Sequence, residues 1–542
     1  MNVRRERGFA AVIAIILILE LILAGCGSNS TKGSEGIQLP KKMKMSFAPG
    51  GEPKTLDPQM SDNIPEAIIE TALFEGIMRL DKENTPQLAV AKSVEVSSDG
   101  LNYTITLKNT KFSNGDPLTA SDFKDSWMHA LNPSSAAASA YQLFYIKNAK
   151  AYYSQTAEAG EVGIKVVDDK TLEITLESPC PFFKSLLALP TYFPVDQLNS
   201  QVHYDWSNGA ATFVGNGPFM LKSWSHKDKM VLVKNPNYYD EASVKLAELD
   251  FNLSADGKEA ASDFEAGKLD GLNNLVPEDT LRFKKNGTLK CAPMLGTYFY
   301  CFNTTKKPLN DLRIRQALSI ALNRQDLMDN VLEGDELPAY AFVPGAIPDA
   351  VPGTTFRTAG SNLIKEDIER AKQLLKDAGY PEGVNFPTLT ILYNTNGSHR
   401  LPAEAIQDYW KKNLGVNVLL QGQDWDVYQK SQQVLQYDIA QACWIGDCVD
   451  PMPFLDIFVT NGGNNKTGWS NPVFDQAVET AQKSPDQTVR MKAMHDAEKI
   501  LMQEMPIIPI YYYEQNYLLK NNIKGVIVSP LACFDFKNAI VQ

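Results

Sequence analysis

The sequence predicts a mixed α/β fold, and three patterns support this prediction. Residues 101–108 alternate apolar and polar side chains, as a half-buried strand does. Residues 368–378 place isoleucine, alanine and leucine at helical spacing, and Gly379 follows where a glycine often ends a helix. The sequence Asn-Gly-Asp-Pro at 114–117 marks a turn between such elements. This mixture excludes an all-β protein and a helical bundle.

The remaining elements are expected from the same patterns. Alternation predicts strands at 171–177 and 230–234. Apolar stripes at helical spacing predict helices over 311–331 and 487–505. The stretch 437–442 is again strand-like. No long low-complexity linker or internal repeat interrupts the body of the chain, so we expect one interwoven body.

The composition is that of an ordinary globular protein. Of the 542 residues, 44% are hydrophobic and 21% charged, which excludes a mainly disordered, collagen-like or coiled-coil protein. The formal net charge of −12 argues against a nucleic-acid partner and against binding to an anionic membrane surface. The length suggests roughly three to five structural units.

The N-terminus has the pattern of a lipoprotein signal. Three arginines lie within residues 1–7, and an apolar stretch interrupted by one glutamate covers 10–23. The stretch ends in Leu-Ala-Gly-Cys26, which resembles a lipobox. We therefore expect residues 1–25 to be a cleaved signal peptide, Cys26 to carry lipid, and 26–42 to be a flexible tether. The alternative is a plain secretory signal.

Six further cysteines follow the expected lipidation site. Outside the cytoplasm they can form disulfides or remain as buried thiols, and the sequence leaves both possibilities open. None lies in a CxxC motif or in a Cys/His spacing typical of zinc. The six are Cys180, Cys291, Cys301, Cys443, Cys448 and Cys533.

The sequence gives no positive support for catalysis. It has five histidines and no HExxH, GxSxG, Walker A or post-strand GxGxxG motif. Carboxylates are plentiful, but no spacing singles out an acid/base pair. We therefore expect a protein that is not an enzyme and that needs neither a metal nor another cofactor.

Aromatic residues gather in the last quarter of the chain. They are Trp425, Trp444, Trp469 and the tyrosines at 511–513. Tyrosine and tryptophan combine a large apolar surface with a polar tip, which suits a ligand cleft. Core packing explains the same residues, and the pattern alone favours it.

Two acidic residues follow the strand-like stretch at 437–442. Asp450 precedes Pro451, a pairing typical of a helix N-cap followed by proline, so Asp450 has a structural explanation. Asp447 has none. A carboxylate at the end of an apolar strand, beside Trp444, is suited to bind an ammonium group.

The chain resembles the solute-binding lipoproteins of ABC peptide importers, solute-binding protein family 5, and most of all their oligopeptide-binding members. The resemblance runs from about Glu52 to the C-terminus and includes the segment around Asp447. Its other motifs are Lys54-Thr-Leu-Asp-Pro58, Leu73-Phe-Glu-Gly-Ile-Met78, Leu118-Thr-Ala-Ser-Asp122 with Trp127, Gly215-Asn-Gly-Pro-Phe219, Gly296-Thr-Tyr-Phe-Tyr300, Asn310-Asp-Leu-Arg-Ile-Arg-Gln-Ala-Leu318, Asn413-Leu-Gly-Val-Asn-Val418 and Pro509-Ile-Tyr-Tyr-Tyr513.

The resemblance implies a periplasmic-binding-protein-like fold of two lobes joined by crossing segments, with an extra domain and the ligand enclosed between the lobes. Carried over, the first lobe takes 43–76, 206–296 and 516–542, the extra domain 77–205, and the second lobe 297–515. It implies a monomeric, membrane-anchored, extracytoplasmic receptor that captures oligopeptides and delivers them to the permease subunits of an ABC importer. Alternative cargoes are dipeptides, a signalling peptide or a metal chelate. A secreted hydrolase and a structural surface protein are the competing classes.

The resemblance also implies roles for individual residues. Asp447 matches the aspartate that binds the N-terminal ammonium of the peptide, with Asp62 nearby. His399 matches a histidine that meets the C-terminal carboxylate, although an exposed loop histidine is nearly as good an explanation. The positions that match other cleft contacts are Trp425, Trp444, Tyr513 and Asn274.

The chain departs from the family pattern at several positions. Two arginines that meet peptide carboxylates correspond to Gln432 and Gln441, and a lysine of similar role corresponds to Leu332. Fixed recognition of a C-terminus is therefore in doubt. The disulfide of some relatives is not reproduced, because Gly296 and Ile445 occupy its positions.

Overall fold

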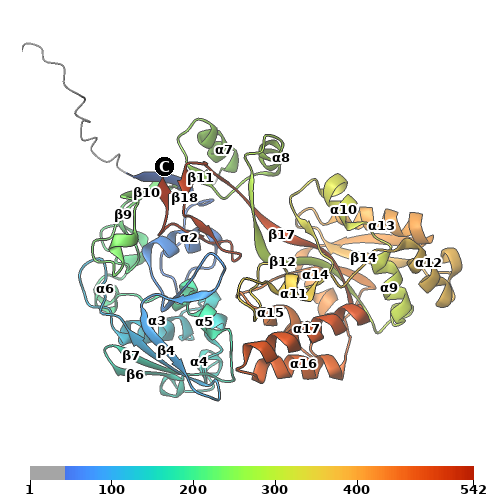
Figure 1. The fold of residues 1–542 in the computed structure, drawn as a ribbon, viewed down its shortest axis with the longest axis horizontal. Coiled ribbons are helices and arrows are strands. Elements are labelled where there is room, and N and C mark those ends of the chain that lie inside the picture. Colours follow the sequence, from blue (N-terminus) through green and yellow to red (C-terminus); the bar gives the residue numbers. More distant parts are fainter. Residues whose placement is uncertain (1–42, 255) are drawn as a thin grey trace, which may run out of the picture. The chain divides into compact units, whose positions relative to one another are not determined.

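The strands form one large mixed sheet and several smaller ones, and helices are interspersed between them, as the predicted mixed α/β class requires (Figure 1). The computed structural model describes residues 43–254 and 256–542. The expected signal peptide, Cys26 and the tether lie outside the described residues. Residues 43–542 group into one compact unit.

The large sheet combines parallel and antiparallel pairs. β1 is parallel to both of its neighbours, and β14 likewise, whereas β12 is antiparallel to both of its own. In spatial order the strands are β15 (Val418–Gln423), β14 (Leu389–Asn394), β16 (Ile439–Ile445), β12 (Lys290–Phe302), β17 (Ile507–Leu519), β11 (Gly271–Leu272), β1 (Lys44–Ala48), β10 (Glu248–Asn252), β9 (Lys229–Lys234) and β8 (Phe219–Ser225), with β13 (Leu337–Pro338) paired to β17.

The strands β12 and β17 link the two ends of this sheet. Each is 13 residues long, and Figure 1 shows both running from the side of β11 toward β14. Their pairing shifts register between Pro293 and Thr297, a break of the kind that bends a strand. Within the break, Gly296 faces Ile445, and a Cβ on Gly296 would lie 2.6 Å from the Ile445 side chain and 2.7 Å from Tyr513. Any larger residue there would force these two side chains to shift.

A second sheet of four antiparallel strands lies apart from the large one. Its order is β4 (Ala91–Val96), β5 (Asn102–Leu107), β7 (Thr171–Thr175) and β6 (Ile164–Asp168). The strands predicted at 101–108 and 171–177 are confirmed here, and their side chains alternate in burial. The two-stranded pairs are β2 (Met78–Leu80) with β3 (Pro86–Leu88), β18 (Ile523–Lys524) with β21 (Ile540–Val541), and β19 (Ile527–Val528) with β20 (Phe534–Asp535).

Two predicted helices are confirmed with their ends. α12 stops at Asp377, and Gly379 follows with a positive φ of 97°, which glycine adopts without strain. α17 covers the stretch predicted at 487–505. The α-helices are α2 (Ile64–Leu73), α3 (Ala120–Leu131), α4 (Ala149–Tyr153), α5 (Phe183–Leu186), α6 (Gln197–Val202), α7 (Gly257–Glu265), α8 (Pro277–Lys285), α9 (Leu312–Ile320), α10 (Arg324–Leu327), α11 (Phe356–Gly360), α12 (Ile368–Asp377), α13 (Arg400–Leu414), α14 (Trp425–Gln433), α15 (Met452–Leu455), α16 (Pro472–Lys483) and α17 (Gln487–Glu504).

The single helix predicted over 311–331 is wrong. α9 ends at Ile320, and the Asn323 side chain accepts a hydrogen bond from the backbone N–H of Asp326. Asn323 therefore caps a new short helix, α10, which continues into a π-helical turn at Met328–Leu332. Apolar residues continue at helical spacing through this break, so the sequence pattern did not indicate that Asn323 begins a new helix.

The buried side chains form three clusters. The largest contains Trp127 and Trp410 and therefore draws on both the expected extra domain and the expected second lobe. The second is built around Phe47, Phe251 and Phe534, and the third is small. The proposed domain boundaries stay a prediction. All six cysteines of the described residues are free thiols, but only Cys180, Cys301 and Cys448 are buried, so the expectation of buried thiols holds for three of the six.

Candidate functional site

Asp447 is positioned by the end of β16. The strand was expected at 437–442 but runs from Ile439 to Ile445, so its end lies two residues before Asp447. The N–H of Gly446 donates to the carbonyl oxygen of Leu295 at 2.8 Å. A Cβ on Gly446 would lie 2.7 Å from the buried ring of Phe454. The absence of a side chain at Gly446 thus lets the backbone pack closely against Phe454 just before Asp447.

The carboxylate of Asp447 has one neutral donor. The hydroxyl of Tyr141 donates to its Oδ1 at 2.9 Å across 306 residues of sequence. Although Asp447 faces the cavity and is exposed, the surrounding protein displaces enough water to raise the pKa of its carboxyl, which the bond from Tyr141 partly opposes. Burial, Asp450 and Asp447 together raise the pKa of Asp456 to about 7. The site is therefore acidic.

Asp450 has the structural role expected of it, and a second one. Its Oδ1 accepts from the N–H of Met452 at 2.9 Å, at the start of α15. The helix begins one residue later than predicted, with Pro451 at the cap position. Asp450 also forms an ion pair with Arg490 of α17, and both side chains are buried. This buried pair joins two helices behind Asp447.

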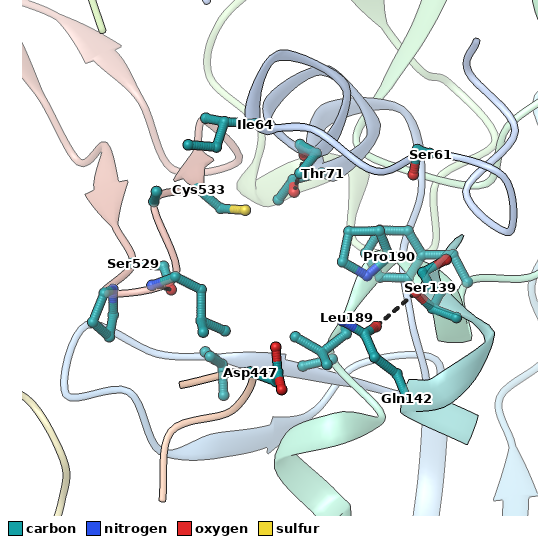
Figure 2. A pocket seen from close by; sticks show the side chains of 18 of the residues that line it. Ser61, Ile64, Thr71, Ser139, Gln142, Leu189, Pro190, Asp447, Ser529 and Cys533 are labelled. Atoms are coloured by element: carbon teal, nitrogen blue, oxygen red, sulfur yellow. Dashed lines mark hydrogen bonds between the residues drawn. The ribbon is translucent and has the colours of Figure 1, made fainter. Parts of the chain in front are cut away.

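A cavity of about 500 Å³ opens in front of Asp447 (Figure 2). Its wall combines residues from α2, from the segment 138–142, from the segment 188–193 and from the segment 527–535, together with Asp447. Asp62 also lies on the wall, and the ammonium of Lys54 is 3.2 Å from its carboxylate. Of the predicted site residues, the cavity brings together Asp447 and Asp62.

A second group of predicted residues lies on the strands next to the cavity. Tyr511 stacks on Tyr298 with ring centres 4.6 Å apart, and Tyr513 meets Tyr511 edge-on at 5.3 Å. Tyr298 also stacks on His399, at 5.6 Å. Trp444 is half-buried on β16, and its indole N–H has no hydrogen-bond partner among the described residues. The rings of Tyr298, Tyr511, Tyr513 and His399 contact one another and form an aromatic wall, and Trp444 lies on β16, the strand paired with the β12 strand of Tyr298.

His399 is not the exposed loop residue that was the alternative explanation. It immediately precedes α13 and is partly buried against Tyr298, and this burial lowers the pKa of its imidazole. Trp425 begins α14, is 46% exposed and stacks on Tyr428 at 6.2 Å. Asn274 lies exposed after β11, against Gly50. Neither Trp425 nor Asn274 is among the residues of the cavity wall.

Two of the positions that depart from the family pattern, 432 and 441, are occupied by amide side chains that form hydrogen bonds within the protein. Gln432 donates through Nε2 to the carbonyl oxygen of Gln441 at 3.1 Å. The side-chain oxygen of Gln441 accepts from Asn394 at 2.9 Å, and both glutamines are buried. Leu332 packs against the largest core cluster. These side chains carry no charge that could meet a peptide carboxylate.

Sequence reasoning missed several residues of the cavity wall. Tyr141 lies in a short 3-10 helix, Ala138–Leu143, within a stretch of serine and alanine that carries no motif. Leu189 and Leu531 are ordinary apolar residues that only the fold brings near Asp447. Within residues 43–254 and 256–542, no group of three His, Cys, Asp or Glu side chains has the geometry to hold a metal. The same part of the chain contains no helix long and apolar enough to cross a membrane.

The sequence matches a known family model and is similar to two bacterial proteins along almost its whole length. The sequence model described as bacterial extracellular solute-binding proteins, family 5 (middle), matches residues 85–466. The oligopeptide-binding protein OppA of Bacillus subtilis (strain 168) is 36% identical over 541 residues, which cover 98% of each chain. The dipeptide-binding protein DppE of the same strain is 35% identical over 536 residues, which cover 97% of each chain.

A solved structure gives the same picture for the fold. The MppA periplasmic murein tripeptide binding protein, in its unliganded open form, superposes with a TM-score of 0.85 at 32% sequence identity. The superposition covers 92% of this chain and 98% of the other.

Proposed function

Because this chain belongs to family 5 of the bacterial extracellular solute-binding proteins, we propose that it captures oligopeptides by their N-terminal ammonium and delivers them to an ABC importer. The family consists of extracytoplasmic receptors that bind solutes. Asp447 is the observation that carries the proposal for this chain, since its carboxylate faces a cavity of ligand size and its one hydrogen-bond donor among the described residues is the neutral Tyr141.

The ammonium of a peptide suits this site electrostatically. A charged hydrogen bond between an ammonium and a carboxylate is roughly twice as strong as a neutral one, and it strengthens further where water is excluded. Tyr141 holds Asp447 in place through one oxygen and leaves the other for the ligand. Asp62, on the same wall, adds negative charge and draws the cationic end of the peptide inward.

The aromatic wall supports the rest of the peptide. An extended peptide beside β16 and β17 meets flat, rigid surfaces from Tyr513, His399 and Trp444. Contacts of this kind do not depend on peptide sequence, and water in roomy side-chain pockets completes them. We assign Trp425 and Asn274 to the outer part of the same cleft.

Binding is coupled to closure of the two lobes. The described chain resembles an unliganded open form, in which a ligand can enter. A peptide that touches both lobes binds the closed form better and shifts the equilibrium toward it. The register break of β12 and β17 near Gly296 is the place where the connecting strands bend.

The receptor works as a monomer at the outer face of the membrane. Lipid on Cys26 anchors it, and residues 26–42 tether the folded body near the permease. The chain is not an enzyme in this proposal, since a receptor needs no nucleophile or metal. Dipeptides are the second candidate cargo, favoured by the resemblance to a dipeptide-binding relative.

Native mass spectrometry of the freshly purified protein tests this function. We expect a ladder of retained peptide masses that disappears after partial unfolding and dialysis and returns when peptides are added. Retained masses confined to dipeptides favour the second cargo. Shortening of added peptides over time indicates a hydrolase and contradicts the receptor.

A further inference from the structure

The cavity in front of Asp447 has mostly apolar walls. Figure 2 shows Ile64 and Thr71 of α2 on one side, with Leu189 and Pro190 opposite. Leu531 belongs to the same wall. A volume of about 500 Å³ exceeds what one large side chain needs and lies within the range of ligand pockets. An apolar group that enters it exchanges contact with water for contact with the apolar wall on the side that faces the protein.

The charged groups of this wall are almost all carboxylates. The one cation among the described residues of the wall is Arg79, and its guanidinium is already used. Its Nε and one terminal nitrogen donate to the two oxygens of Glu75, at 2.9 and 2.8 Å, and the other terminal nitrogen pairs with Asp535. The remaining charged residues of the wall are Asp62, Asp81 and Asp447.

A carboxylate brought into this cavity finds no free cation in the described part of the wall to offset the water that it loses. It would lose water, and the one guanidinium there is shared between Glu75 and Asp535, a group of three with a net negative charge. Asp62 and Asp447 would repel it at close range. The exposed ammonium of Lys54 pairs with Asp62 at 3.2 Å and weakens its repulsion, but Lys54 is not among the residues of the wall and places no cation in the cavity.

The position of Asp447 determines which part of a peptide reaches the cavity. In a peptide the N-terminal nitrogen and the first Cα are about 1.46 Å apart, so an ammonium held by Asp447 places the first side chain at the cavity. The rest of the chain follows β16 and β17, where Trp444 and Tyr513 lie outside the cavity wall. The first side chain of the peptide thus enters the cavity, whereas the later side chains lie along the strands outside it.

We propose that this cavity is a selectivity subsite for the first side chain of the peptide, which accepts large apolar side chains and rejects acidic ones. This inference rests on the proposed peptide-binding function and on an ammonium held at Asp447. It makes the receptor selective at its first position, while the aromatic wall tolerates different sequences further along.

Calorimetry with three tripeptides on cargo-free protein tests the inference. We expect Phe-Ala-Ala to bind about tenfold or more tightly than Ala-Ala-Ala, since a phenyl ring leaves water. Asp-Ala-Ala should bind roughly tenfold or more weakly than Ala-Ala-Ala. Equal affinities for the three would overturn the subsite while leaving the receptor intact. No binding of any of the three, or of longer peptides, would instead overturn the peptide-binding function itself.

Two wall variants locate the effect. Thr71→Phe fills the cavity from α2 and should abolish the preference for Phe-Ala-Ala over Ala-Ala-Ala. Leu531→Lys adds a cation and should raise the affinity for Asp-Ala-Ala relative to wild type. Circular dichroism and an unchanged unfolding midpoint demonstrate that each variant is folded. If Thr71→Phe keeps the full preference, the first side chain lies elsewhere and the assignment is wrong.

Discussion

Replacing Asp450 by alanine should destabilise the protein strongly without removing the peptide-binding charge. Arg490 is 0% exposed and Asp450 is 3% exposed, so the variant leaves a buried guanidinium without its carboxylate. Breaking a buried pair in this way costs about 3–5 kcal/mol. Loss of the bond from the Met452 N–H alone would cost about 1 kcal/mol. Urea denaturation followed by circular dichroism measures the difference.

Two further variants distinguish the ion pair from the helix cap. Asp450→Asn keeps an oxygen for the Met452 N–H but removes the charge, so we expect it to be nearly as unstable as Asp450→Ala. The double replacement Asp450→Leu with Arg490→Met should recover most of the stability, because no buried charge remains. If Asp450→Ala costs about 1 kcal/mol and Asp450→Asn restores it, the cap dominates and our reasoning about the pair is wrong.

Three other predictions follow from the sequence and the structure. Cys26→Ala should release the protein from membranes or leave it unprocessed, and equal membrane retention in detergent fractionation would contradict a lipid anchor. Tyr141→Phe removes the donor to Asp447 and should weaken peptide binding by roughly five- to tenfold in calorimetry, the equivalent of one hydrogen bond; an unchanged affinity would mean that Asp447 needs no support. The pKa of His129 is raised by its bond to Asp57, so the ion pair stabilises the folded protein below the unfolded pKa of about 6.5 and is lost as pH rises through the higher folded value. His129→Gln should therefore cost more stability at pH 5.5 than at pH 8.5, by less than about 1 kcal/mol since His129 is half-exposed, and an equal cost at both pH values would refute the pairing.

Local patterns predicted individual elements well because the physics that forms them is local. Gly379 ended its helix where expected, since a left-handed residue suits glycine whatever the tertiary fold. The break at Asn323 was missed because capping competes with a continuous apolar stripe, and the stripe was the stronger pattern. The predicted strand at 437–442 stopped three residues before the C-terminal end of β16, because pairing with β12 extends β16 past Ala442.

The site was predictable only in part, because its contacts cross long sequence separations. Asp447 stood out as a carboxylate without a structural explanation, and the fold places it on a cavity. Tyr141 and Asp447 are 306 residues apart, and no motif links them. The buried partner of Asp450 was equally invisible, since Arg490 lies 40 residues away on another helix. Which residues line a cavity depends on how distant segments pack, so no local pattern indicated that Leu531 lies on the cavity wall.

The most direct measurement of the central claim is calorimetry with one peptide in free and N-acetylated form, on wild type and on Asp447→Ala. We predict that acetylation weakens binding to wild type on the order of a hundredfold, because it removes the charge that Asp447 holds. Asp447→Ala should bind the free peptide about as weakly, and acetylation should then have little further effect, since both changes delete one interaction. If acetylation leaves the affinity for wild type unchanged, Asp447 does not hold the ammonium and the account of peptide capture is wrong.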